Sequence, residues 1–143
     1  MIFSFVHAKW TAADREILWA ALINDESLSL PWFIAGDFNV IAGEEEKIGV
    51  PFRIWEGVEL LSFMSMAGLM DAGFRGSKFT WRNNGRGCTC IWKCLDKLLY
   101  DQSVLGLGIN FMVQHLSRPR LIMLHSCYLH LLGWIALPNR FSF

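Results

Sequence analysis

The hydrophobic pattern near the start of the chain predicts an amphipathic helix followed by a buried strand. Apolar residues recur at helical spacing through residues 12–24, and Thr11 with Asp14 can cap the first turn of that helix. The residues that share this spacing are Ile17, Leu18, Ala21 and Leu22. The next apolar run, residues 32–35, shows no alternation, which is typical of a strand buried on both faces.

The middle of the chain predicts a second helix, preceded by an exposed loop. The helix is predicted over residues 54–67, with Gly68 as its C-terminal stop. Its predicted apolar face consists of Trp55, Val58, Leu61 and Met64. The acidic stretch 43–49, which begins and ends with glycine, is predicted to be an exposed loop.

A β-hairpin is predicted after the second helix. Composition favours a strand over residues 79–81, residues 83–85 (Asn-Asn-Gly) are a strong turn signal, and residues 91–95 are the expected returning strand. No internal repeat or linker interrupts the pattern, and a chain of 143 residues suits one domain. Because 53% of the residues are hydrophobic and 18% are charged, the chain can bury a sizeable core.

Charge is distributed unevenly, although the net charge is zero. Residues 1–71 carry four Lys or Arg and eleven Asp or Glu, whereas residues 72–143 carry nine and two. Six of the later bases lie within residues 75–97, a segment with a single acid. Such a segment can contact phosphates, or it can simply be a solvated basic face. Charge alone leaves both interpretations open.

Neither a targeting segment nor a membrane span is evident. The N-terminus lacks the basic region of a signal peptide, and the late apolar run 127–137 is shorter than the ~20 residues that a span requires. Cys88, Cys90 and Cys94 lack the spacing of zinc ligands and are interpreted as reduced thiols. We therefore expect an intracellular protein, with nuclear and cytoplasmic locations both open.

The stretch PWFIAGDFNVI (residues 31–41) carries the first candidate chemistry. Gly36 permits a sharp exit from the predicted strand, and the exit presents a carboxylate and a carboxamide two positions apart, Asp37 and Asn39. On an extended exit, side chains at this spacing point the same way and can face one site. The alternative is a polar turn that only ends the strand.

Three motifs together resemble a known family. PWFIAGDFNVI…EEEKIG, MAGLMDAGFRGSKFTWRNN and IWKCLDKLLYD occur in this order. They are similar to the endonuclease domain of plant LINE-type non-LTR retrotransposons, in the endonuclease/exonuclease/phosphatase (DNase I-like) superfamily. The resemblance extends over about residues 6–118.

The resemblance implies an α+β fold, a partial four-layer α/β/β/α sandwich whose N-terminal half is missing. Residues 1–118 would be the partial endonuclease/exonuclease/phosphatase domain, and residues 119–143 a divergent or out-of-frame tail. Members of the superfamily hydrolyse phosphodiesters with Mg²⁺ or Mn²⁺, so DNA is the implied partner. Neither a membrane nor a small-molecule cofactor is implied, and the oligomeric state stays open.

The resemblance also assigns roles to single residues. Asp37 would position and deprotonate the attacking water, and Asn39 would donate to the phosphate. In the family motif RLDR, the Asp orients the catalytic His. Here residues 94–97 read CLDK, so Asp96 matches while both arginines are replaced. Asp96 could alternatively be a surface partner of a neighbouring lysine. The basic segment supplies the nucleic-acid-binding candidates Arg82, Arg86, Lys93 and Lys97.

Two parts of the family pattern are not matched. In the family, the motif that reads Val6-His7-Ala8 here follows an N-terminal half with the metal-binding Glu. No residue of this chain matches that Glu, so the metal is not expected to bind. The catalytic His belongs to a family motif Ser-Asp-His-x-Pro-Leu, which is expected soon after Arg118 and is not found. His125 lies in this region, but no Asp precedes it.

The genetic code suggests how the histidine motif was lost. Residues 120–126 can be encoded as CGT CTG ATC ATG CTC CAC TCC. Read from the third base, the same DNA encodes Ser-Asp-His-Ala-Pro-Leu. We hypothesise a frameshift between about residues 118 and 120; the alternative is a divergent native C-terminus. The genomic DNA decides between them.

The sequence therefore predicts a degenerate fragment of a metal-dependent phosphodiesterase, a retrotransposon DNA endonuclease, that is catalytically inactive. The alternative is a non-catalytic nucleic-acid-binding remnant that uses residues 75–97.

Overall fold

The computed structural model describes residues 1–24, 30–115 and 127–131 of the chain. The elements in order are β1 (Ile2–His7), α1 (Ala12–Ile23), β2 (Trp32–Asp37), β3 (Lys47–Ile48), α2 (Val58–Ala67), β4 (Leu69–Asp71), β5 (Arg75–Gly76), β6 (Trp81–Arg82), β7 (Trp92–Lys93), β8 (Asp96–Asp101), β9 (Phe111–His115) and β10 (Cys127–Leu131). Short 3₁₀ helices span Glu44–Glu46, Ile54–Glu56, Gly87–Thr89 and Gln102–Leu107. No helix in these described ranges is long and apolar enough to cross a membrane.

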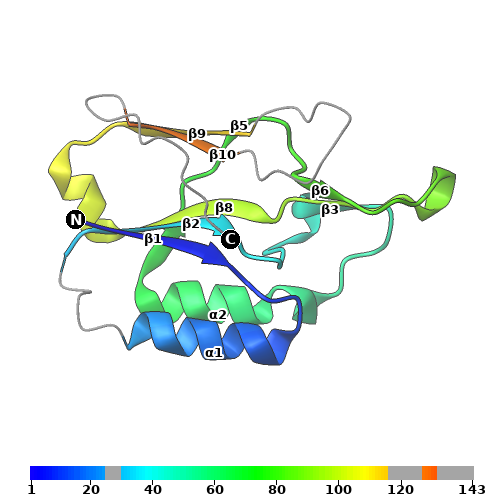
Figure 1. The fold of residues 1–143 in the computed structure, drawn as a ribbon, viewed down its shortest axis with the longest axis horizontal. Coiled ribbons are helices and arrows are strands. Elements are labelled where there is room, and N and C mark those ends of the chain that lie inside the picture. The colour runs from blue at the N-terminus through cyan, green and yellow to red at the C-terminus, as the bar shows by residue number, and fades with distance from the viewer. Residues whose placement is uncertain (25–29, 116–126, 132–143) are drawn as a thin grey trace.

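The described elements form three layers (Figure 1). The central sheet has the order β1-β2-β8-β4, with β1 parallel to β2 and the other pairs antiparallel. Helices α1 and α2 cover one face of this sheet, and a second sheet, β10-β9-β5, lies over the other face. A third sheet, β3-β7-β6, extends from one end. The mixed α+β class is thus confirmed.

Strand β2 supplies apolar side chains to both faces of the central sheet. Trp32 and Ile34 join the core beneath the helices, whereas Phe33 joins the core toward β9. These three residues are at most 3% exposed. The prediction of a strand buried on both faces is confirmed, because alternate residues of a strand point to opposite faces.

The predicted helices form, but both predicted apolar faces are partly wrong. In α1, Leu18 and Leu22 pack against the core as predicted, whereas Ile17 is 70% exposed and Ala21 is also exposed. Thr11 caps α1 as expected, and Gly68 ends α2 in the left-handed conformation. The predicted face of the second helix was wrong, because Trp55, Val58 and Leu61 are 66%, 50% and 48% exposed. The residues that pack on the sheet from this helix are Leu60, Phe63, Met64 and Ala67. These four residues also recur at helical spacing. The predicted start at residue 54 was too early, because Ile54–Glu56 form a 3₁₀ turn and α2 begins at Val58.

The predicted hairpin is present, but its strands are short. β6 pairs with β7, and the long connection 83–91 is fixed by the Asn83 side chain, whose Oδ1 accepts the amide N–H groups of Gly85 and Ile91. The stretch 43–49 is only partly the predicted loop, because Lys47 and Ile48 pair with β7. In the segment predicted to be a tail, β10 pairs with β9.

Gly36 explains how β2 approaches β1 so closely. Its φ is +142°, and an added Cβ would lie under 3.0 Å from the Val6 carbonyl oxygen. We expect Gly36→Ala to lower the free energy of unfolding by about 3 kcal/mol, because the strained conformation and the backbone clash add. Urea unfolding of the variant measures this loss.

Gly106→Ala is the matched control, because a Cβ at Gly106 meets nothing within 4 Å. Equal free energies of unfolding in the two variants would show that the close approach of β1 and β2 does not require glycine at position 36.

Candidate functional site

The two central strands bring two predicted site residues opposite one another. Asp37 and Asp96 are partners in the antiparallel register of β2 and β8, and His7 is the parallel partner of Asp37 on β1. Side chains at paired positions lie on the same face of a sheet. By alternation this is the face of Phe33, which packs toward the second sheet.

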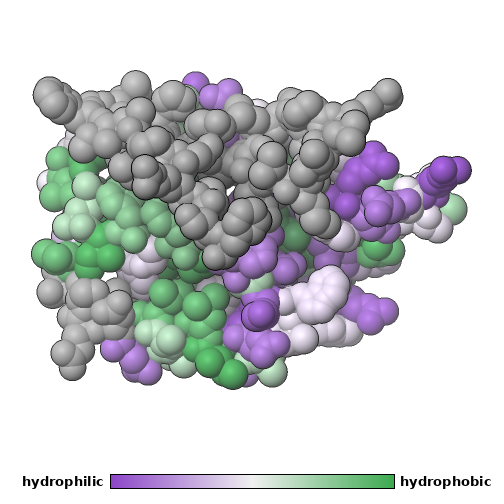
Figure 2. Space-filling model, in the orientation of Figure 1, coloured by the Kyte–Doolittle hydropathy of each residue, from purple (hydrophilic) through white to green (hydrophobic). Residues whose placement is uncertain are grey.

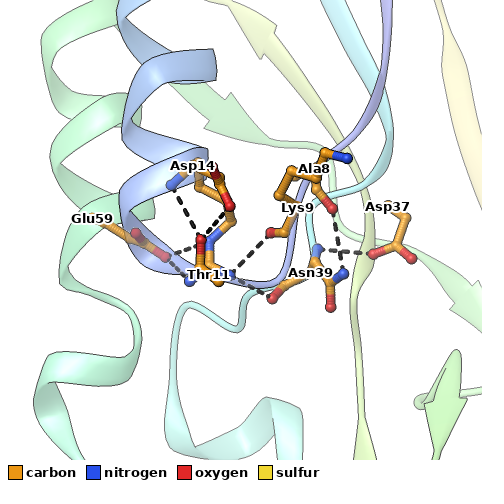
Figure 3. A network of polar contacts seen from close by, with 8 residues as sticks. Ala8, Lys9, Thr11, Asp14, Asp37, Asn39 and Glu59 are labelled. Carbon is orange, nitrogen blue, oxygen red and sulfur yellow. Dashed lines mark hydrogen bonds and ion pairs between the residues drawn. The ribbon is translucent and has the colours of Figure 1, made fainter.

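Asn39 lies in a tight turn directly after β2. Its φ is +52°, and its backbone N–H donates to Asp37 Oδ1 at 2.8 Å. The Asn39 side-chain amide donates to the Ala8 carbonyl oxygen at 3.3 Å, as Figure 3 shows. The exit from β2 is therefore a polar turn and not the extended exit that the sequence analysis assumed, and it holds Asp37 and Asn39 side by side through a hydrogen bond.

Thr80 fixes the start of β8. Its hydroxyl oxygen accepts the backbone N–H groups of Leu95 at 2.9 Å and of Asp96 at 3.1 Å. The carbonyl oxygen of Leu95 in turn accepts the Phe38 N–H at 2.9 Å. These contacts join the strand end that carries Asp96 to the turn that carries Asp37. Sequence reasoning placed Thr80 on a neighbouring strand and did not identify this role.

Arg15 braces the same turn from helix α1. The guanidinium Nη1 donates to the carbonyl oxygens of Lys9 and Asn39, each at 3.2 Å, and the group forms an ion pair with Glu59 of α2. Arg15 is 7% exposed. This network, drawn in Figure 3, therefore ties both helices to the exit of β2.

Lys97 and Asp96 are both buried, at 3% and 5% exposed. Lys97 forms ion pairs with Glu46 and with Asp71. The alternative of Asp96 as a surface partner of a lysine is therefore wrong, because Asp96 is enclosed at the start of β8. Lys97 therefore differs from the exposed bases of the segment 75–97 with which the sequence analysis grouped it, because its ammonium group is buried in these ion pairs.

The other three basic candidates lie on or beside the hairpin. Arg82 and Arg86 are exposed, and Lys93 is half-buried. The Arg82 guanidinium lies 5.0 Å from the Trp92 ring, and the Lys93 ammonium lies 5.8 Å from the Trp81 ring. Figure 2 shows hydrophilic side chains gathered at the end of the molecule where β6 and β3 lie. Burial, and then the charge of Lys47, lower the pKa of Lys93.

A cavity of about 250 Å³ adjoins Asp96 between the two sheets, with His115 of β9 in its wall. His115 is 2% exposed, and its Nδ1 lies 3.0 Å from the Ser77 carbonyl oxygen, so Nδ1 carries the proton that it donates. Burial lowers the pKa of His115, and the hydrogen bond to Ser77 and the charge of Asp96 only partly oppose this. The ring is therefore neutral near pH 7.

The described residues do not form a ready site for a hard cation. Nowhere in ranges 1–24 and 30–115 do three His, Cys, Asp or Glu side chains gather in a way that could hold a metal ion. Cys94 lines the cavity beside Asp96, but burial raises the pKa of its thiol to about 12, so it remains protonated and inert. His125 lies outside the described residues.

The fold of this chain is similar to that of solved structures. One of them is the endonuclease domain of TRAS1, a telomere-specific non-LTR retrotransposon, with a TM-score of 0.52 and 14% sequence identity. The match covers 76% of this chain and 47% of that one. At this identity the likeness concerns the fold alone. No protein-family model and no curated protein match the sequence.

The buried His115 makes stability depend on pH. Its pKa lies below the ordinary 6.5 in the folded state, so the unfolded chain binds the proton more readily, and stability falls as pH drops below about 6.5. We expect the free energy of unfolding, measured by urea titration across this range, to decline less in His115→Gln than in the unmodified chain.

An identical decline in the His115 variant and the unmodified chain contradicts the assignment.

Proposed function

We propose that this chain carries the remnant of a metal-dependent phosphodiesterase site of the retrotransposon DNA endonuclease type, and that the chain alone does not cleave DNA. The observation that supports the proposal best is the juxtaposition of Asp37, Asp96 and Asn39 where β2 ends and β8 begins. The likeness in fold to a retrotransposon endonuclease domain adds independent support.

Each of these residues suits a step of phosphodiester hydrolysis. Asp37 is only partly buried at a strand end, where its carboxylate can orient a water and accept its proton during in-line attack. Asn39 supplies an amide donor beside it, suited to the growing charge on the phosphate oxygens. Asp96, whose backbone N–H donates to the Thr80 hydroxyl, is the residue to which the resemblance assigns the orientation of the catalytic histidine.

The proposal of inactivity rests on the side chains that residues 1–143 offer. None of them matches the metal-binding Glu or the Ser-Asp-His motif of the family, and the described ones gather no three-residue cation site. These residues by themselves do not fit a bound Mg²⁺ or Mn²⁺. Groups that act as a unit lose activity steeply when one member is absent.

Incubation of the purified chain with supercoiled plasmid and Mg²⁺ or Mn²⁺ tests this proposal. We expect no conversion to the nicked form above a buffer control, measured on agarose gels. Asp37→Ala provides the matched comparison, because it removes the proposed base. Metal-dependent nicking by the unmodified chain that disappears in Asp37→Ala would falsify the proposal of inactivity and would establish the catalytic role of Asp37.

A second candidate function is DNA binding without cleavage, through a surface that we call the hairpin surface: Arg82, Arg86, Lys93, Trp81 and Trp92. Its two arginines are exposed, and two of its three cations, Arg82 and Lys93, lie over tryptophan rings. This combination of charge and aromatic rings suits phosphate contact and base stacking. Lys97 is left out of this surface, because it is buried in ion pairs.

The hairpin surface predicts salt-sensitive DNA binding. We expect Arg82→Ala to weaken binding and to reduce the slope of log K against log salt by about 1, because one phosphate contact is lost. Fluorescence anisotropy with a labelled duplex measures both. Arg53→Ala is a matched control, because Arg53 also lies over a tryptophan, 5.5 Å from the Trp55 ring, but outside the basic segment. Equal losses in the two variants would contradict a specific role for the hairpin surface.

A further inference from the structure

Helix α2 carries apolar side chains on two opposite sides. Its inner side packs in the core against the central sheet. On its outer side Val58, Leu61 and Met66 recur at helical spacing, and they are 50%, 48% and 73% exposed. The one charged residue of this helix, Glu59, is held in the ion pair with Arg15. A helix that is apolar all round is ordinarily buried all round, but no described element covers the outer side of α2.

Exposed apolar side chains beside α2 extend this surface. A groove of about 730 Å³ runs between α1 and α2, with Trp10, Trp55, Val58 and Met66 in its walls. Trp10 and Trp55 are 75% and 66% exposed, and Ile17 of α1 is 70% exposed. Figure 2 shows hydrophobic side chains gathered over the two helices. We call this surface the helix face; it consists of Trp10, Ile17, Trp55, Val58, Leu61 and Met66.

The helix face is large enough to form an interface. From ordinary side-chain areas, its six residues expose roughly 350–650 Å² of apolar surface. A standard interface buries about 800 Å² on each partner, of which about 450 Å² is apolar. The helix face therefore supplies the apolar area that one side of such an interface needs.

Charge indicates what covers the helix face. Helices α1 and α2 together contain one base, Arg15, which is 7% exposed, so neither helix offers a lysine or arginine to lipid head groups or to nucleic-acid phosphates. All six residues of the helix face are uncharged, so a charged protein surface placed against them would lose its hydration without gaining a partner. The surface that fits is equally apolar and uncharged, and a second copy of the helix face has both properties.

We propose that two copies of this chain associate through the helix face about a twofold axis, with α2 of one copy antiparallel to α2 of the other. A twofold axis sets the same patch of both copies together, so an uncharged apolar patch is its own complement. Ser62 lies midway between Val58 and Met66 in the helix and is exposed, and its small side chain lets the two helices approach. An axis at Ser62 places Val58 of each copy beside Met66 of the other.

The ends of the helices favour this antiparallel arrangement. Helices α1 and α2 run in the same direction (Figure 1). Neither has a basic residue in its last turn, so both C-terminal ends keep the partial negative charge of the helix dipole. Near the N-terminal ends the exposed bases Lys9 and Arg53 balance the exposed acids Asp14 and Glu16, so the partial positive charge of the dipoles remains there. The antiparallel arrangement brings these opposite charges together.

Sedimentation equilibrium of the purified 143-residue chain tests the proposal. We expect a monomer–dimer equilibrium between 16.4 kDa and twice that mass, with a dissociation constant in the micromolar range. Leu61→Glu places a charge in the interface twice per dimer, and we expect the dissociation constant to rise about 100-fold, a factor of about ten for each copy.

Leu105→Glu is the matched control. Leu105 is exposed to a similar extent, at 57% against 48% for Leu61, but it lies in the 3₁₀ helix Gln102–Leu107, outside the helix face. This variant should dimerise like the unmodified chain. Thermal melts establish that each variant is folded.

Two charge variants test the antiparallel register. Val58→Lys and Met66→Glu, each alone, should weaken self-association about tenfold or more. An equimolar mixture of the two should recover a heterodimer, because the introduced ammonium and carboxylate groups then lie side by side across the axis. Both positions are exposed in the single chain, so the variants are expected to fold.

Four results would overturn the proposal. They are a chain that stays monomeric up to about 100 µM, association that continues beyond the dimer, equal dissociation constants for Leu61→Glu and Leu105→Glu, and a mixture of the charge variants that forms no heterodimer. A chain that stays monomeric but binds uncharged lipid vesicles would assign the helix face to a membrane instead. The proposal involves neither Asp37 nor the hairpin surface, so its outcome is independent of the DNA experiments.

Discussion

The antiparallel ladder between β2 and β8 is the constraint on which the rest of the structure depends. It pairs Phe33 with Tyr100 at one end and Asp37 with Asp96 at the other. Phe33, Leu98 and Leu99 are at most 1% exposed. A slip of one residue would turn the apolar side chains of one strand to the wrong faces. The hydrophobic cores on the two faces therefore fix the register, and the register places the two carboxylates opposite one another.

Two carboxyl side chains at directly paired positions are an arrangement that sheets ordinarily avoid, since like charges directly opposite one another repel. The surrounding structure commits several buried polar groups to holding this arrangement. Thr80 fixes the backbone at Asp96, the turn at Asn39 adopts a left-handed φ to donate to Asp37, and Arg15 supports that turn from behind. Locally unfavourable conformations and pairings that the surrounding structure supports in this way are typical of functional sites.

Sequence reasoning found the elements with a strong local signal and missed the interactions that depend on tertiary packing. The capped helix α1, the doubly buried strand β2 and the hairpin all follow from spacing over a few residues. The face of α2 could not be deduced, because Leu61 and Leu60 are equally apolar and only the packing on the sheet selects between them. Arg15 and Glu59 are 44 positions apart, and each is a charged residue that would ordinarily face solvent. In the sequence, Lys97 and Arg82 are both bases of the segment 75–97 and cannot be told apart. Only the folded structure brings Glu46 and Asp71 to Lys97 and shows that it is buried.

The buried pair of Arg15 and Glu59 connects the turn of the candidate site with helix α2. Breaking a buried pair by removing one partner costs about 3–5 kcal/mol, because the other charge is left uncompensated. The Nη1 of Arg15 donates to the carbonyl oxygens of Lys9 and Asn39. Its Nε and Nη2 both contact a single oxygen of Glu59, Oε1. The same guanidinium therefore holds the turn at Asn39 and joins helix α1 to helix α2.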